Sequence, residues 1–109
     1  MPVCFQLFRK DGSSREPLVL QDVDEEICKH FEVPCDPVKW VCGWFDSIGF
    51  RLACGKSFAQ IREEFGRYVE EEKAEGNEDH VRLYVDLGNI AEFMEGQYST
   101  SSFYSPYKD

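Results

Sequence analysis

The chain has 109 residues, and its 21 Asp and Glu residues against 12 Lys and Arg residues give a net charge of −9. With 42% hydrophobic and 15% aromatic residues it is too apolar for a disordered chain, so we expect one folded domain. The negative charge disfavours direct binding of nucleic acid or of an anionic membrane, because affinity for either comes largely from Lys and Arg.

The first third of the sequence predicts two strands and a helix. Residues 3–9 and 16–20 are short β-prone runs, and an Asp-Gly step between them favours the tight turn of a β-hairpin. Asp22 then serves as the N-cap of a short helix that ends before Pro34. Apolar residues recur four apart along this helix at Val23, Ile27 and Phe31.

Two further helices are predicted in the middle of the chain. The first begins at Pro37, which fits the first helical position after an Asp cap, and ends near Gly49. Its apolar stripe, typical of a central buried helix, comprises Val38, Val41, Cys42, Phe45, Ile48 and Leu52. The second follows a capping box of Ser57 with Gln60 and ends at Gly76. Its apolar face comprises Phe58, Ile61, Phe65, Tyr68 and Val69.

The last third predicts one more strand. Residues 81–87 alternate between apolar and polar side chains, which is the pattern of a half-buried strand. One or two helical turns are expected over 89–95, and a Ser- and Tyr-rich tail over 97–109 follows a single domain over 1–96. The order β-β-α-α-α-β-α predicts an α+β fold in which three to four helices pack on a small three-stranded antiparallel sheet.

The cysteines and histidines favour neither catalysis nor a metal. Five cysteines cannot all pair within one chain, so we expect reduced thiols in a cytoplasmic protein. Four possible zinc ligands lack the closely spaced cysteine pair of structural zinc sites. They are Cys28, His30, Cys35 and Cys42. Residues 54–57 resemble the end of a phosphate-binding loop, but Phe50 stands where its first glycine belongs. We expect no enzyme, no cofactor and no bound metal.

The acidic residues form two blocks. Residues 21–36 carry six acids against one base, and residues 58–80 carry eight acids against three bases. Carboxylates at the C-terminal end of a helix interact unfavourably with the helix dipole. Several locally unfavourable residues that occur together often mark a functional site. The alternative is a solvated helix end that keeps the protein soluble. The predicted partner-binding acids are Glu70, Glu71, Glu72 and Glu75 in the second block and Asp22, Asp24, Glu25 and Glu26 in the first.

A tryptophan adds a further candidate contact. Trp40 is expected away from the apolar stripe of its helix, where it is either covered by the hairpin or tail or exposed as a binding hot spot. We therefore expect a non-enzymatic protein that occupies a basic, nucleic-acid-binding surface of another protein, as an inhibitor, antitoxin or immunity-type protein does. The alternatives are an assembly protein that homo-oligomerises through aromatic surface, and a small thiol- or metal-dependent enzyme.

Overall fold

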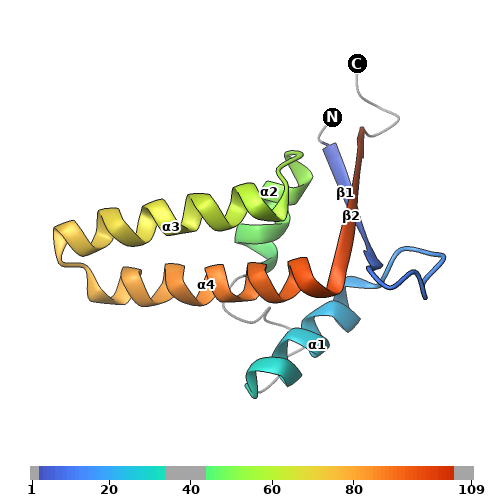
Figure 1. The fold of residues 1–109 in the computed structure, drawn as a ribbon, viewed down its shortest axis with the longest axis horizontal. Helices are drawn as coiled ribbons and strands as arrows, with labels where there is room; N and C mark the ends of the chain where they lie inside the picture. The colour runs from blue at the N-terminus through green and yellow to red at the C-terminus, as the bar shows by residue number, and fades with distance from the viewer. Residues whose placement is uncertain (1–2, 34–43, 105–109) are drawn as a thin grey trace.

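The computed structural model describes residues 3–33 and 44–104, which form a mixed helix and strand fold (Figure 1). The elements, in chain order, are β1 (Val3–Arg9), α1 (Leu20–Phe31), the π-helical turn η2 (Phe45–Gly49), α2 (Phe50–Ala53), α3 (Phe58–Glu75), α4 (Glu78–Gln97) and β2 (Tyr98–Tyr104). Within the described residues the sheet is antiparallel and has two strands, so the prediction of three strands is wrong.

The sheet joins the first described strand to the last. β1 pairs with β2 from Val3 opposite Tyr104 to Arg9 opposite Tyr98. The predicted hairpin partner, residues 16–20, is not a strand, and Tyr98–Tyr104 from the predicted tail takes its place. Pro17 explains the difference, because a proline has no N–H to donate to a strand ladder.

Helix α1 confirms the predicted helix but begins earlier. Its N-cap is Val19 rather than Asp22, which lies in the first turn. Val23 and Ile27 are buried, as their spacing predicts. The helix ends at Glu32, whose φ of 56° is left-handed and directs its N–H back to the carbonyl groups of the last turn.

The predicted central helix is described only from Trp44 onward, so Val38, Val41 and Cys42 lie outside the described residues. The prediction that it ends near Gly49 is wrong, because η2 continues directly into α2. Gly49 has a helical φ of −60°. A Cβ there would make ordinary contacts of 3.5 Å with the Phe45 ring and 3.6 Å with the Phe5 ring, so the helix packs close to β1 at this position.

Helices α3 and α4 form a long antiparallel hairpin (Figure 1). The capping box at Ser57 and the left-handed Gly76 at the end of α3 are both confirmed. The predicted strand 81–87 is wrong, because these residues lie within the 20-residue helix α4. Its buried residues recur at helical rather than alternating spacing. They are Leu87, Ile90, Ala91 and Met94.

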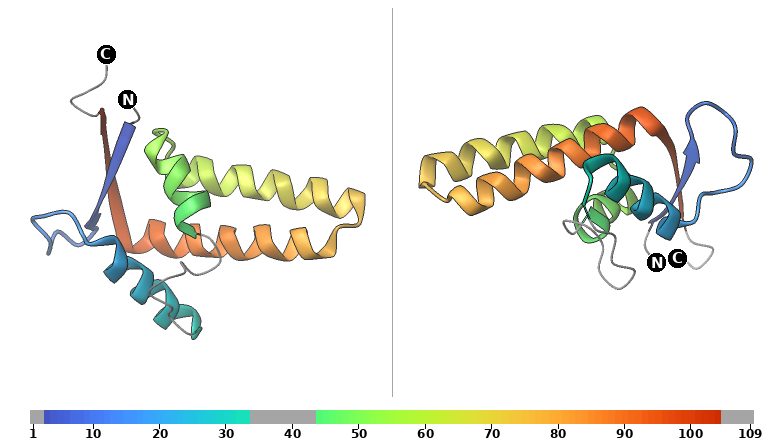
Figure 2. Two further views of the ribbon diagram at one scale, coloured as in Figure 1. Left: turned by 180° about the vertical axis from the view of Figure 1, so that it is seen from behind. Right: turned by 90° about the horizontal axis from the view of Figure 1, so that it is seen from below.

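The core lies where one half of this hairpin meets the other elements. η2 and α2 pack across one face of the hairpin, and α1 begins near the sheet end of α4 and slants away from it (Figures 1 and 2). Trp44, Ile48 and Leu52 are fully buried between these helices and the sheet. The other half of the hairpin extends away from the sheet, and the turn between α3 and α4 lies at its far end (Figure 1).

Candidate partner-binding surface on the α3–α4 hairpin

The turn between α3 and α4 gathers acidic residues from both helices. Residues 70–79, here called the acidic hairpin end, hold six acids against one base, so they carry −5 of the net charge of −9. The acids are the predicted Glu70, Glu71, Glu72 and Glu75 from α3, together with Glu78 and Asp79 from α4. The structure therefore brings the four predicted acids of this block together and adds two that the sequence reading missed.

Few positive groups offset this charge. Lys73 lies 3.6 Å from Glu70, and both side chains are exposed. His80 Nδ1 lies 3.4 Å from Glu72, and the amide of Asn77 donates to Glu72 at 2.6 Å. Exposed ion pairs contribute at most about 1 kcal/mol, so they do not hold the carboxylates firmly. Most of the negative charge remains available to a partner.

The start of α4 makes the clustering of carboxylates at the C-terminal end of α3 less unfavourable. Glu78 and Asp79 lie in the first turn of α4, where the helix dipole is positive. That positive end lies beside the C-terminal end of α3, because the two helices are antiparallel (Figure 1). The carboxylates on α3 are therefore less unfavourable than an isolated helix would make them.

The acids of α1 do not extend this surface. Asp24 is 2% exposed and accepts a hydrogen bond of 2.9 Å from Trp44. Glu26 pairs with Arg9 and accepts a bond of 2.5 Å from the Tyr98 hydroxyl. The hydrogen bond from Arg9 holds the pKa of Glu26 below its usual value. Both carboxylates thus contact groups of their own chain.

Two of the four predicted partner-binding acids of this block stay exposed. Asp22 and Glu25 lie in the first half of α1, which starts beside the sheet and far from the hairpin turn (Figure 1). The two acidic blocks therefore do not form one surface. Trp40 lies outside the described residues, whereas Trp44 is fully buried.

An ion cluster around the buried Glu64 fixes the root of the hairpin. Glu64 accepts a hydrogen bond of 2.5 Å from Arg51 Nε and also pairs with Lys56. Burial raises the pKa of Glu64, but the hydrogen bonds from Lys56 and Arg51 outweigh this effect and lower the pKa to about 2. The Arg51 guanidinium also stacks 4.9 Å above the Phe65 ring. These contacts tie α2 and the following loop to α3.

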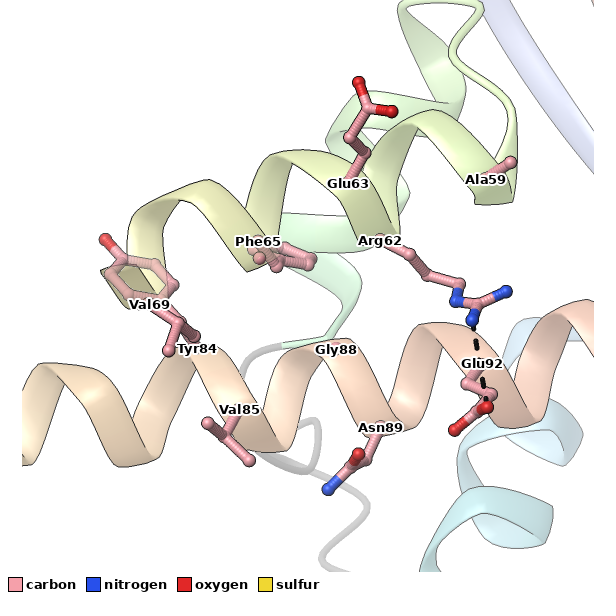
Figure 3. A pocket seen from close by; sticks show the side chains of 11 residues that line it. Ala59, Arg62, Glu63, Phe65, Val69, Tyr84, Val85, Gly88, Asn89 and Glu92 are labelled. Carbon is pink, nitrogen blue, oxygen red and sulfur yellow. Dashed lines mark ion pairs between the residues drawn. The ribbon is translucent and has the colours of Figure 1, made fainter. Parts of the chain in front are cut away.

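A groove runs between α3 and α4 (Figure 3). It holds about 470 Å³ beside Gly66 and Gly88, and a neighbouring hollow of about 640 Å³ continues it toward the turn, with Val85 lining both. We call the two together the hairpin groove. Its small and apolar lining residues are Ala59, Gly66, Val69, Val81, Val85 and Gly88.

Charged residues flank the groove at the end nearer the sheet. Arg62 from α3 reaches across to α4, where it lies 3.8 Å from Glu92 and also pairs with Glu95 (Figure 3). Glu63 projects from the α3 side (Figure 3). The groove thus has an apolar floor between charged rims, and it leads to the acidic hairpin end.

The described part of the chain contains neither a metal-ligand cluster nor a membrane-spanning helix. Among residues 3–33 and 44–104, no three His, Cys, Asp or Glu side chains are placed to hold a metal ion. Of the four zinc-ligand candidates, Cys35 and Cys42 lie outside that part, and Cys28 is buried and donates to Asp24 at 4.0 Å. In the same residues, none of the helices combines the length and apolar character needed to cross a bilayer.

No family model matches the chain, and comparison with curated proteins and with solved structures gives no match either. The function has to be argued from the surface itself. The sequence reading missed the hairpin groove because it assigned 81–87 to a strand. One signal could have revealed it: Gly66 stands in the middle of a predicted helix, where glycine is unfavourable.

Proposed function

We propose that this protein is a non-enzymatic binding protein whose acidic hairpin end engages a basic surface of another protein. The observation that carries the proposal is the convergence of six carboxylates from two helices, with one lysine among them, at one end of the molecule. Carboxylates and phosphates present negative charge alike, so such a surface suits a partner site that otherwise binds nucleic acid. An inhibitor, antitoxin or immunity-type protein acts in this way.

The position of the charge favours rapid association. The acidic hairpin end lies far from the sheet (Figure 1), so a partner can approach it from several sides. Clustered charges act together within a screening length of about 8 Å at physiological salt, and they steer encounter with a cationic surface. The exposed thiol of Cys54 suits a reducing compartment, and we place this binding in the cytoplasm.

Photocrosslinking from the acidic hairpin end tests the proposal. A photoreactive residue at Glu71 should capture a partner from lysate of the source cells, whereas the same residue at Glu16, at the other end of the molecule, should not. The captured protein, once purified, should bind nucleic acid in competition with this chain. A captured protein that has no basic surface, or that binds nucleic acid and this chain together, would contradict the proposal.

Charge reversal then tests the mechanism with the purified partner. The fourfold Lys variant of the predicted α3 acids should associate at least tenfold more slowly at low salt, because peripheral charge mainly governs the association rate. Those acids are Glu70, Glu71, Glu72 and Glu75. The matched control makes the same change in charge at exposed positions elsewhere and should associate at the normal rate. Its positions are Glu16, Asp22, Glu25 and Glu32. Unchanged association of the first variant would exclude the acidic hairpin end as the interface.

A further inference from the structure

We infer that the hairpin groove is a docking site for a cationic amphipathic helix of the partner protein. This inference rests on the proposed function and deepens it, because it names the kind of segment that the binding surface receives. An amphipathic helix binds such a groove by placing apolar side chains at positions i, i+3 or i+4, and i+7 along its floor.

The floor of the groove is apolar and open. Val85 is 41% exposed, and Val69 and Val81 are partly exposed beside it. η2 and α2 pack on the opposite face of the hairpin, so they do not cover these residues (Figures 2 and 3). Of the five large hydrophobic residues that the described part of the chain exposes, two lie in α4, Leu83 and Val85. Of these two, Val85 lines both hollows of the groove and Leu83 lines neither.

Two glycines in the groove point to a second helix. Gly66 and Gly88 lie within α3 and α4, where glycine is less favourable than alanine. A Cβ at Gly66 would meet nothing within 4 Å, and one at Gly88 would make only an ordinary contact of 4.0 Å with Phe65. Packing within the chain therefore does not require glycine at either position. The absence of side chains there lets another helix approach the hairpin closely.

Charge selects the occupant. The hairpin, residues 58–97, holds 11 acids and 4 bases and so carries a charge of −7. A second copy of this chain would bring the same charge against it, and the two would repel. A helix with Lys and Arg on both sides of an apolar stripe complements the hairpin, and among the residues that line the groove four acids stand against three bases. The acids are Glu63, Glu72, Glu78 and Glu92, and the bases are Arg62, Lys73 and Arg82. The 18 residues of α3 span about 27 Å, which accommodates a helix of about five turns.

A designed peptide pair tests the inference. The probe is an 18-residue helix of Leu and Lys with Leu on one face, and its isomer has the same composition with Leu scattered around the helix. By fluorescence anisotropy, the amphipathic peptide should bind the protein at least tenfold more tightly than the isomer. Gly66→Leu should weaken its binding at least tenfold, because the new side chain fills the groove. Gly96→Leu, which lies in α4 and like Gly66 has no atoms within 4 Å of a Cβ, should change it less than twofold.

The outcomes separate this inference from the proposed function. Equal binding of both peptides, or unchanged binding by Gly66→Leu with its fold verified by circular dichroism, would overturn the groove as the site. The fourfold reversal to Lys would still weaken both peptides if the acidic hairpin end binds them by charge. The converse result, in which Gly66→Leu abolishes binding and the reversal does not, would support the groove and contradict the acidic interface. A dimer in sedimentation that Gly66→Leu dissociates would assign the groove to a second copy instead.

Discussion

The indole Nε1 of Trp44 donates a hydrogen bond of 2.9 Å to Oδ1 of Asp24, and both residues are buried. The bond joins α1 to the helical segment that packs across the hairpin. A buried carboxylate is costly unless polar groups contact it, so this pair fixes one orientation of α1 against the core. An acid that the sequence reading assigned to a partner surface instead holds the fold together.

Replacing Asp24 with Ala should lower the free energy of unfolding by about 1 to 3 kcal/mol, because the buried indole N–H loses this acceptor. Urea denaturation followed by tryptophan fluorescence measures the change. Glu25→Ala, at an exposed position of the same helix, should remain within about 0.5 kcal/mol of the unmodified protein. Equal effects of the two substitutions would contradict a structural role for the Trp44 bond.

Glu64→Gln should destabilise the protein in a pH-dependent way. The folded-state pKa of about 2 lies below the ordinary value of 4.5, so the ionised carboxylate contributes its full stability above about pH 4.5. That contribution is lost as the pH falls from 4.5 toward 2. We expect the free energy of unfolding of the variant to be about 2 to 3 kcal/mol lower than that of the unmodified protein at pH 7. This difference should shrink steadily as the pH falls from about 5 to 3.

Urea titrations at several pH values measure how the stability difference between Glu64→Gln and the unmodified protein changes with pH. Glu63→Gln, at the exposed neighbouring position, provides the control and should show a small difference that does not change with pH. A gap between Glu64→Gln and the unmodified protein that stays constant down to pH 3 would show that the ion pairs with Arg51 and Lys56 are not what stabilises the hairpin root.

Two glycine substitutions, one within α3 and one at its C-terminal cap, should have opposite effects. Gly66→Ala should raise the free energy of unfolding by about 0.5 to 1 kcal/mol, because alanine favours the helix and a Cβ there meets nothing within 4 Å. Gly76→Ala should lower it by about 1 to 2 kcal/mol, because the φ of 77° strains any residue with a Cβ. Thermal melts of the two variants decide the point, and destabilisation by Gly66→Ala would indicate a contact that glycine alone permits.

Phe65→Ala should be far more damaging than Glu71→Lys. Phe65 is buried and stacks against Tyr84 with 6.1 Å between ring centroids, so its truncation should cost about 3 to 5 kcal/mol. Glu71 is exposed on the acidic hairpin end, where a lysine relieves repulsion and should be neutral or slightly stabilising. Differential scanning calorimetry of both variants provides the comparison, and a larger loss from the charge reversal would contradict the packing described for α3.

The parts of the fold that were predicted correctly depend on local signals. The capping box at Ser57 and the left-handed Gly76 define α3 from residues within a few positions of its ends. The strand prediction for 81–87 failed because Val81, Leu83 and Val85 alternate with polar residues as they would in a half-buried strand. These residues instead lie in α4, where Leu83 and Val85 are exposed to solvent. The helical spacing of α4 is seen in Tyr84, Leu87 and Ala91, which face the core, and it depends on packing against α3 and η2.

The candidate site was predicted only in part for the same reason. Four acids at the end of α3 could be identified from their number and their position in one helix. Glu78 and Asp79 join them only because α4 is a helix that turns back along α3. The pairing of β1 with β2 was equally inaccessible, since Val3 and Tyr104 come from opposite ends of the sequence and no local pattern relates them.

The β1–β2 pairing also sets the order in which contacts can form. Every paired residue in the sheet is separated from its partner by nearly the whole chain, whereas α3 and α4 meet across the short turn at Gly76. Contacts distant in sequence form slowly, and those close in sequence form fast. The α3–α4 hairpin therefore belongs to the part of the molecule that we expect to form rapidly. Because the contacts between α3 and α4 do not involve the two strands, we expect the hairpin to keep its shape if the strands separate.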